Sequence, residues 1–122
     1  MMIYLKEKEV IMAKQKVPIK HYQELSKLFP EVFSALENLG SAIRAAGPLT
    51  EKTVELIQLA GAASSQMEGS VHSHTRRALK AGASPEEIYQ TLILLMSTIG
   101  FPKVSSSIMW AQDVMKGRKK KR

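Results

Sequence analysis

Apolar and polar residues show no sustained alternation along this chain, and its β-branched residues are scattered, so strand signals are missing. Glycine and proline fall at points that divide the sequence into blocks of helix length. The pattern therefore predicts an all-α protein, a bundle of about six helices. The expected helices cover residues 21–29, 30–46, 51–64, 70–81, 85–99 and 102–116.

Capping residues mark several of these boundaries. Thr50 is placed to cap the helix that begins at Glu51, whose carboxylate suits the positive end of the helix dipole. Ser84, followed by Pro85 in the first turn and Glu87 at the third helical position, has the pattern of a capping box. A polar break over residues 64–69 is expected between the third and fourth helices.

The stretch from Ile88 to Ile99 is apolar over a wide arc. At about 100° per residue its apolar side chains cover about 160° of a helix surface, and Leu94 is apolar outside that arc. One core-facing side usually needs less. The helix is therefore either central to its own core or buried between subunits, and Leu94 favours a homo-oligomer. The other interpretation is a single exposed leucine, which is common on protein surfaces.

Size and composition indicate a single helical domain. The chain has 122 residues and no cysteine, so it lacks disulfides, thiolate metal ligands and a thiol nucleophile, which fits a reducing compartment. Charges interrupt every apolar run near the N-terminus, and no window reaches the ~18 apolar residues of a membrane span. We expect a cytoplasmic protein with an N-terminal extension over 1–20, a helical domain over 21–117 and a basic tail over 118–122. A basic stretch follows Met12, so residues 1–11 are expected to lie upstream of the natural start.

The net charge of +7 is concentrated at one end of the chain. The five basic residues from Arg118 to Arg122 leave 13 basic against 11 acidic residues elsewhere, a net charge of +2. Such a run is usually solvated and attracts phosphates weakly and without sequence specificity. Nucleic-acid binding is therefore not expected beyond weak contact by this tail.

His74 is a candidate proton donor because of its position on the fourth expected helix. It falls between the core-facing side of that helix and the outer side that carries Arg76. Ser70, one turn earlier, and Arg77, three residues later, share its side. An imidazole that titrates near neutrality, beside a guanidinium that can hold a carboxylate, makes a workable acid with an anion-binding group. The other interpretation is that His74 borders the core and Arg77 is solvated.

The remaining polar residues offer weaker signals. His72 and His74 point about 200° apart on a helix and cannot grip one metal ion, so no metal site is expected. Ser70 and Ser73 lack the glycine-flanked turn of a hydrolase nucleophile. Glu55 lies on what reads as an ordinary polar helix face.

Three sequence blocks resemble the carboxymuconolactone decarboxylase family, whose superfamily includes the alkylhydroperoxidase D-like proteins. They are TEKTVELIQLAGAASSQ, HTRRALKAGASPEEIYQTLILL, and GFP followed by a helix, and they extend from about Leu49 to Lys116. Residues before Leu49 match only as a helical arm. The resemblance implies an all-helical alkylhydroperoxidase D-like bundle and a homo-oligomer based on trimers, commonly a hexamer.

The redox branch of this family has a glutamate, two cysteines and a histidine at fixed spacing. The corresponding positions here hold Glu55, Met67, Ser70 and His74. A thioether and a hydroxyl cannot form the disulfide that reduces a peroxide. Peroxidase activity through the chain's own thiols is therefore excluded.

The decarboxylase branch also lacks the cysteine pair and resembles this chain in a histidine followed shortly by an arginine, here His74 and Arg77. The resemblance implies a lyase without a cofactor that acts on a small unsaturated acid or lactone, with His74 as the general acid and Glu55 orienting it. We add Arg77 as a carboxylate clamp, and expect Ser70 and Met67 to touch the substrate. The segment 69–73 departs from that branch's turn, which leaves the substrate open.

Two functions from different classes remain. A lyase or related enzyme predicts a pocket in which His74, Glu55 and Arg77 converge. A non-catalytic, homo-oligomeric protein that binds small molecules predicts instead that Arg77 or Glu55 points into water.

Overall fold

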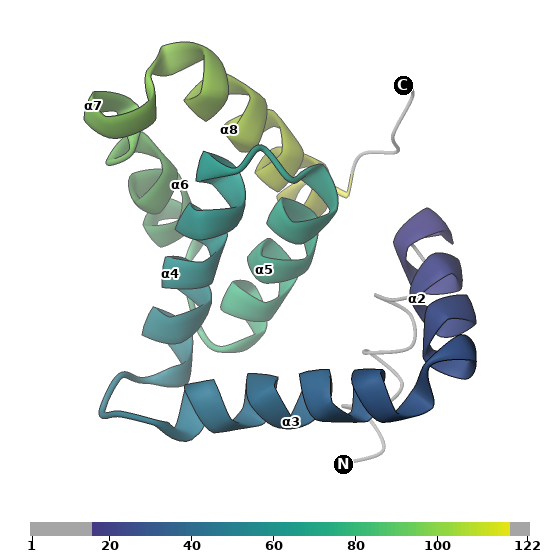
Figure 1. Cartoon of the computed structure of the whole chain (residues 1–122). Coiled ribbons are helices and arrows are strands. Elements are labelled where there is room, and N and C mark those ends of the chain that lie inside the picture. The colour runs from purple at the N-terminus through teal and green to yellow at the C-terminus, as the bar shows by residue number, and fades with distance from the viewer. Residues whose placement is uncertain (1–15, 118–122) are drawn as a thin grey trace. The chain divides into compact units, whose positions relative to one another are not determined.

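The computed structural model describes residues 16–117, and nearly all of them are helical (Figure 1). No strand occurs in that range, so the predicted all-α class is confirmed. No helix in the same range is long and apolar enough to cross a membrane. The expectations about residues 1–11 and about the tail at 118–122 lie outside the described residues. The helices are α2 (Lys16–Leu28), α3 (Pro30–Ala45), α4 (Glu51–Ser64), α5 (Glu68–Lys80), α6 (Pro85–Ile93), α7 (Met96–Ile99) and α8 (Phe101–Met115).

Two compact units divide between Pro48 and Leu49. The first contains α2 and α3, which pack against one another. The ring of Tyr22 meets that of Phe33 edge to face, with 5.0 Å between centroids, and the Tyr22 hydroxyl donates to Glu37 Oε1 at 3.0 Å. Helix α3 buries none of its residues. The two helices are therefore held together by a few side-chain contacts, and α3 contributes no buried apolar side chain to them.

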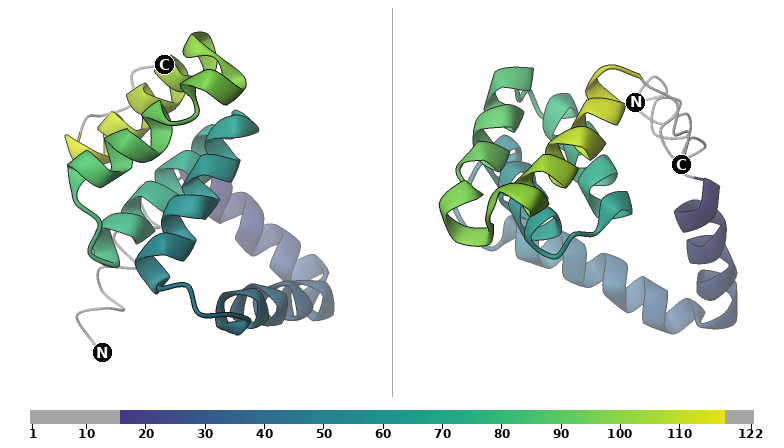
Figure 2. Two further views of the ribbon diagram at one scale, coloured as in Figure 1. Left: turned by 90° about the vertical axis from the view of Figure 1, so that its left-hand side faces the viewer. Right: turned by 90° about the horizontal axis from the view of Figure 1, so that it is seen from above.

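The second unit is a bundle in which α4 and α5 form an antiparallel hairpin (Figures 1 and 2). Helix α8 packs against α5, and α6 packs against both α4 and α8. Side chains from all four helices meet in one core. Its fully buried members are Leu59, Ala63, Val71, Ala78, Ile88, Leu92 and Ala111. This core fixes α4 and α5 relative to one another.

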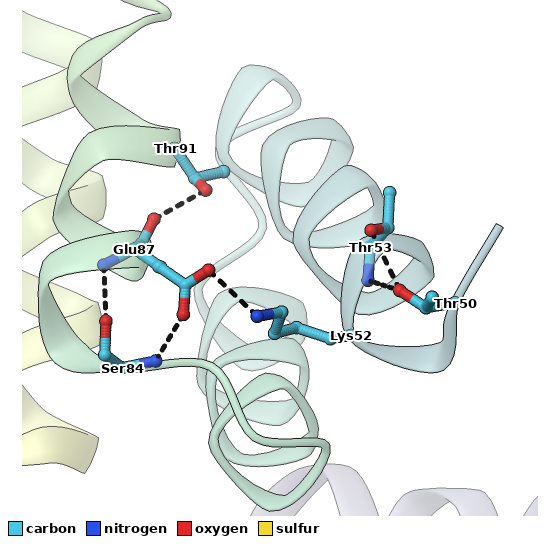
Figure 3. A network of polar contacts seen from close by, with 6 residues as sticks. All are labelled: Thr50, Lys52, Thr53, Ser84, Glu87 and Thr91. Carbon is cyan, nitrogen blue, oxygen red and sulfur yellow. Dashed lines mark hydrogen bonds and ion pairs between the residues drawn. The ribbon is translucent and has the colours of Figure 1, made fainter.

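The expected caps are present at the starts of α4 and α6. Thr50 Oγ1 accepts a hydrogen bond from the Thr53 amide at 3.2 Å. At α6 the Glu87 amide donates to Ser84 Oγ at 3.1 Å, and the Ser84 amide donates to Glu87 Oε1 at 3.0 Å, which completes the capping box. The other oxygen of Glu87 lies 3.1 Å from Lys52 Nζ, so an ion pair joins the first turn of α4 to that of α6 (Figure 3).

The prediction of one continuous helix over 85–99 is wrong. Helix α6 ends at Ile93, a turn follows at Leu94 and Leu95, and α7 runs for only four residues. The hydrogen bond of the Leu95 amide goes to Leu92 at 3.1 Å, three residues back instead of four, so the chain tightens there. The change of direction lets Leu95 pack on the core while Leu94 stays exposed.

The polar break before the fourth helix is also shorter than predicted. Helix α4 continues through Ser64 and α5 begins at Glu68, so only residues 65–67 lie outside a helix. Gln66 in this connection has a φ of 53°, in the left-handed region. One residue in that conformation reverses the chain, which brings α4 and α5 side by side at once.

Candidate active site

Glu55 of α4 and His74 of α5 meet across the helical hairpin. His74 Nδ1 lies 2.8 Å from Glu55 Oε1. Glu55 is only 3% exposed, whereas 16% of the His74 side chain remains exposed. The contact therefore joins a buried carboxylate to an imidazole at the edge of the core.

The interpretation of Glu55 as part of an ordinary polar face is wrong. Glu55, Leu59 and Ala62 are spaced by four and three residues and are all buried, so they lie on the core-facing stripe of α4. A buried carboxylate is costly unless a hydrogen-bonded partner compensates it. His74 supplies such a partner, and this explains how a glutamate is accommodated on the apolar side of the helix.

The contact to Glu55 orients the imidazole of His74. When Glu55 is ionised it can only accept, so Nδ1 carries the proton and donates to Oε1. The second ring nitrogen, Nε2, is then the one that can exchange a proton with a molecule from solvent. Because 16% of the His74 side chain is exposed, the residue is not sealed from solvent. The pair has the chemistry of a histidine acid or base oriented by a carboxylate.

The other residues expected at the site differ in burial. Ser70 is half-buried and Met67, which precedes the first residue of α5, is 54% exposed. Both lie on the side of α5 that carries His74. Arg77 lies on that side too, but it is exposed. The structure therefore brings Glu55 and His74 together and leaves Arg77 in contact with water.

A second histidine–carboxylate pair was missed by the sequence reasoning. His72 Nε2 lies 3.3 Å from Asp113 Oδ2 of α8, and each of the two side chains is 13% exposed. Burial lowers the pKa of His72 below its ordinary value more than the hydrogen bond to Asp113 raises it. No local pattern could have found this pair, because its members are 41 residues apart in sequence.

Arg76 does not point away from the protein as expected. It is half-buried, and its Nη1 atom is buried. Burial lowers the pKa of its guanidinium. Arg76 lies one turn after His72 on the side of α5 that α8 covers, and α8 makes that side an interior surface.

Gln66 is a further residue that the sequence did not single out. Its side-chain amide lies 2.7 Å from the Ala63 carbonyl, 3.0 Å from the Lys103 carbonyl and 3.1 Å from Ser107 Oγ. These contacts join the turn between α4 and α5 to α8. The one feature that marks Gln66 is its positive φ. A backbone angle cannot be seen in the sequence, so the role of Gln66 could not be predicted.

The two histidines of α5 engage different carboxylates, so they do not converge on one point. Among residues 16–117 no group of three or more histidine, cysteine, aspartate or glutamate side chains is placed to hold a metal ion.

Comparisons with known proteins agree with the helical architecture. A model of the carboxymuconolactone decarboxylase family matches residues 30–113. The structure is similar to the apo crystal structure of a carboxymuconolactone decarboxylase family protein from Legionella pneumophila, with a TM-score of 0.78 and 25% sequence identity. That match covers 92% of this chain and 99% of the other. A search of curated proteins gave no match. The family model begins at Pro30, so the matched region includes α3. The sequence blocks that carry the resemblance begin only at about Leu49.

Proposed function

Because the chain belongs to the carboxymuconolactone decarboxylase family, we propose that it is a lyase or related enzyme that needs no cofactor and acts on a small unsaturated acid or lactone. The observation that carries this proposal is the 2.8 Å contact between His74 Nδ1 and the buried Glu55 carboxylate. It supports His74 as the general acid and Glu55 as the residue that orients it.

The proposed reaction is the loss of carbon dioxide from an unsaturated lactone acid. The bond from the carboxylate carbon to the substrate breaks, and its electron pair enters the conjugated lactone to give a dienolate. That dienolate then takes a proton on carbon from His74 Nε2, and water restores the proton to the imidazole. Glu55 stabilises the imidazolium form from which the proton leaves.

We propose that Met67 and Ser70 contact the substrate, because both lie on the His74 side of α5. Their identities also fix what the site cannot do. Met67 and Ser70 occupy the positions at which the redox branch carries cysteines, and the chain has no cysteine anywhere. Peroxide reduction through a disulfide of this chain is therefore excluded.

The proposal is tested by turnover in heavy water with small unsaturated lactone acids as substrates. Nuclear magnetic resonance would follow loss of the carboxylate and uptake of deuterium on carbon. The wild type should convert at least one such acid, and the rate of His74→Gln should be lower by about 100-fold or more. Glu55→Gln should lose less, because the ring stays in place.

His72→Gln is the matched control, since it removes the other histidine–carboxylate contact of the same helix. It should keep a rate close to that of the wild type. If His74→Gln and His72→Gln retained equal activity, His74 would not be the acid and the proposal would fail.

A second candidate function is a non-catalytic protein that binds small acids and retains the fold. The exposure of Arg77 favours it, because a clamp for a substrate carboxylate would be expected to be shielded from water. A thermal-shift screen against lactones and dicarboxylates separates the two. Stabilisation of the wild type that His74→Ala abolishes, without turnover of any ligand that binds, would support the binding protein over the lyase.

A further inference from the structure

Met67 is an exposed methionine directly before the first residue of α5. Its side chain is 54% exposed, more than that of Met96, Met109 or Met115, the other methionines of residues 16–117. A thioether that solvent can reach is oxidised by peroxides to the sulfoxide. Because the Met67 side chain lies outside the hydrophobic core, this oxidation does not disturb buried packing. Met67 is therefore the methionine of the described range that is best placed for oxidation.

The backbone of Met67 has the geometry of a helix N-cap. Its φ of −99° and ψ of 94° are extended, and its carbonyl accepts the first hydrogen bond of α5, from the Val71 amide at 2.9 Å. The N-caps of α4 and α6, Thr50 and Ser84, each use a side-chain oxygen to accept an amide of the first turn. A thioether is at most a weak acceptor, and no side-chain hydrogen bond caps α5.

Oxidation of Met67 supplies the acceptor that this helix start lacks. The sulfur lone pair attacks one oxygen of a hydroperoxide, so an S–O bond forms and the O–O bond breaks. Sulfur is oxidised by two electrons, and the hydroperoxide, which keeps its proton, leaves as water or an alcohol. The sulfoxide oxygen is as many bonds from Cα as Oε1 of a glutamine. It can accept a hydrogen bond from the amide of Gly69 or Ser70, the second and third residues of α5.

We propose that Met67 is an oxidation site and that its sulfoxide caps α5. The consequence for activity rests on the proposed function. Met67 lies about two helical turns before His74 on the same side of α5, with Ser70 between them. Oxidation makes this apolar side chain polar and draws it toward the helix backbone, so its apolar contact with the substrate is lost. Hydroperoxides therefore stabilise the fold and weaken substrate binding, and sulfoxide reductases reverse both effects.

Peptide mapping by mass spectrometry tests the modification. The full chain is treated briefly with hydrogen peroxide, and the gain of one oxygen is followed for each methionine. Met67 should be oxidised faster than Met96, Met109 and Met115, in line with its greater exposure. Oxidation of Met67 at or below the rate of these three would overturn the proposal.

Thermal unfolding tests the cap through two substitutions at one position. Met67→Gln places an amide oxygen where the sulfoxide oxygen would lie, and Met67→Leu has neither an acceptor nor an oxidisable sulfur. After identical peroxide treatment, the Tm of Met67→Gln and that of the wild type should exceed the Tm of Met67→Leu by about 2 °C. Met109→Leu, which keeps Met67, is the control and should respond as the wild type does. A treated wild type that melts no higher than treated Met67→Leu would overturn the cap.

Calorimetric binding of a small unsaturated lactone acid separates this proposal from the proposed function. Its affinity should be about fourfold lower for the oxidised wild type and for Met67→Gln, as expected when roughly one methylene-sized apolar contact is lost. Peroxide-treated Met67→Leu should bind as the untreated wild type does. Equal affinities of all forms would refute the effect on the site. If no form bound or converted such an acid, the proposed function would fail, and the Tm comparison would still decide the cap.

Discussion

His72 of α5 lies 3.3 Å from Asp113 of α8, on the other side of the helix from the contact that His74 makes with Glu55 of α4. The two rings leave α5 in nearly opposite directions because they are two residues apart. Each ring is held by a carboxylate from a different neighbouring helix. Two histidine–carboxylate contacts therefore hold α5 against α4 and α8, and only the contact with α4 involves a buried acid, Glu55.

The His72 contact predicts that stability falls in mild acid. Burial lowers the pKa of His72 below 6.5, and the nearby Arg76 charge lowers it further, while Asp113 and Glu68 oppose both effects. The unfolded chain therefore binds a proton at a higher pH than the folded chain does. The free energy of unfolding should decrease as the pH drops below about 6.5. Urea denaturation at pH 7.5, 6.5 and 5.5 measures this loss.

His72→Gln is the variant that identifies the titrating group. It cannot take up the proton, so its stability should change less between pH 7.5 and 5.5 than that of the wild type. An equally large decrease in the variant would assign the effect to another residue. His21, which is exposed, supplies the control substitution His21→Gln, and this should leave the pH dependence unaltered.

Removing His74 should destabilise the fold through Glu55. His74→Ala leaves a buried carboxylate without this imidazole, at an expected cost of about 3 kcal/mol in the free energy of unfolding. Glu55→Gln removes the charge and should cost less. The double variant, His74→Ala with Glu55→Gln, should lose less free energy of unfolding than the two single variants lose together, because the two side chains interact with one another. Additive losses in urea denaturation would mean that the contact contributes little.

The helix boundaries could be predicted where local chemistry sets them. Thr50, Ser84 and Pro30 act on backbone groups within one turn, so the sequence is sufficient to place the starts of α4, α6 and α3. The end of α6 depends on a distant surface. Leu95 packs on a core that other helices build. The apolar pattern of residues 85–99 is continuous, so it does not show that the helix ends before Leu95.

The site could be predicted only in part for the same reason. His74 was found from its place on the edge of an amphipathic helix, and Glu55 from a family resemblance. The burial of Glu55 was missed because one acidic residue in an apolar stripe reads as a polar position. Asp113 and Gln66 act across 41 and 37 residues of sequence, through tertiary contacts that have no local signature.

The capping box of α6 gives a prediction about stability (Figure 3). Ser84→Ala removes the hydroxyl that accepts the Glu87 amide proton, and should lower the free energy of unfolding by about 1 kcal/mol. Ser105→Ala, at an exposed position within α8, should change it by less than about 0.5 kcal/mol. Equal effects of the two substitutions in urea denaturation would contradict a specific role for the cap.

Two opposing effects can be separated at Gln66, the residue that closes the turn between α4 and α5. Gln66→Ala removes the side-chain amide that lies within hydrogen-bond distance of Lys103 and Ser107, and it keeps a side chain at a φ of 53°. We expect it to cost about 1–3 kcal/mol, because the hydrogen bonds from the side-chain amide to Lys103 and Ser107 of α8 are lost. Gln66→Gly removes the same contacts but relieves the left-handed strain, so it should be more stable than the alanine variant by roughly 1 kcal/mol. Urea denaturation of both variants tests this order. If the alanine variant were at least as stable as the glycine variant, the turn would have to rearrange when the glutamine is lost. The contacts of the Gln66 side chain would then be what maintains the left-handed conformation.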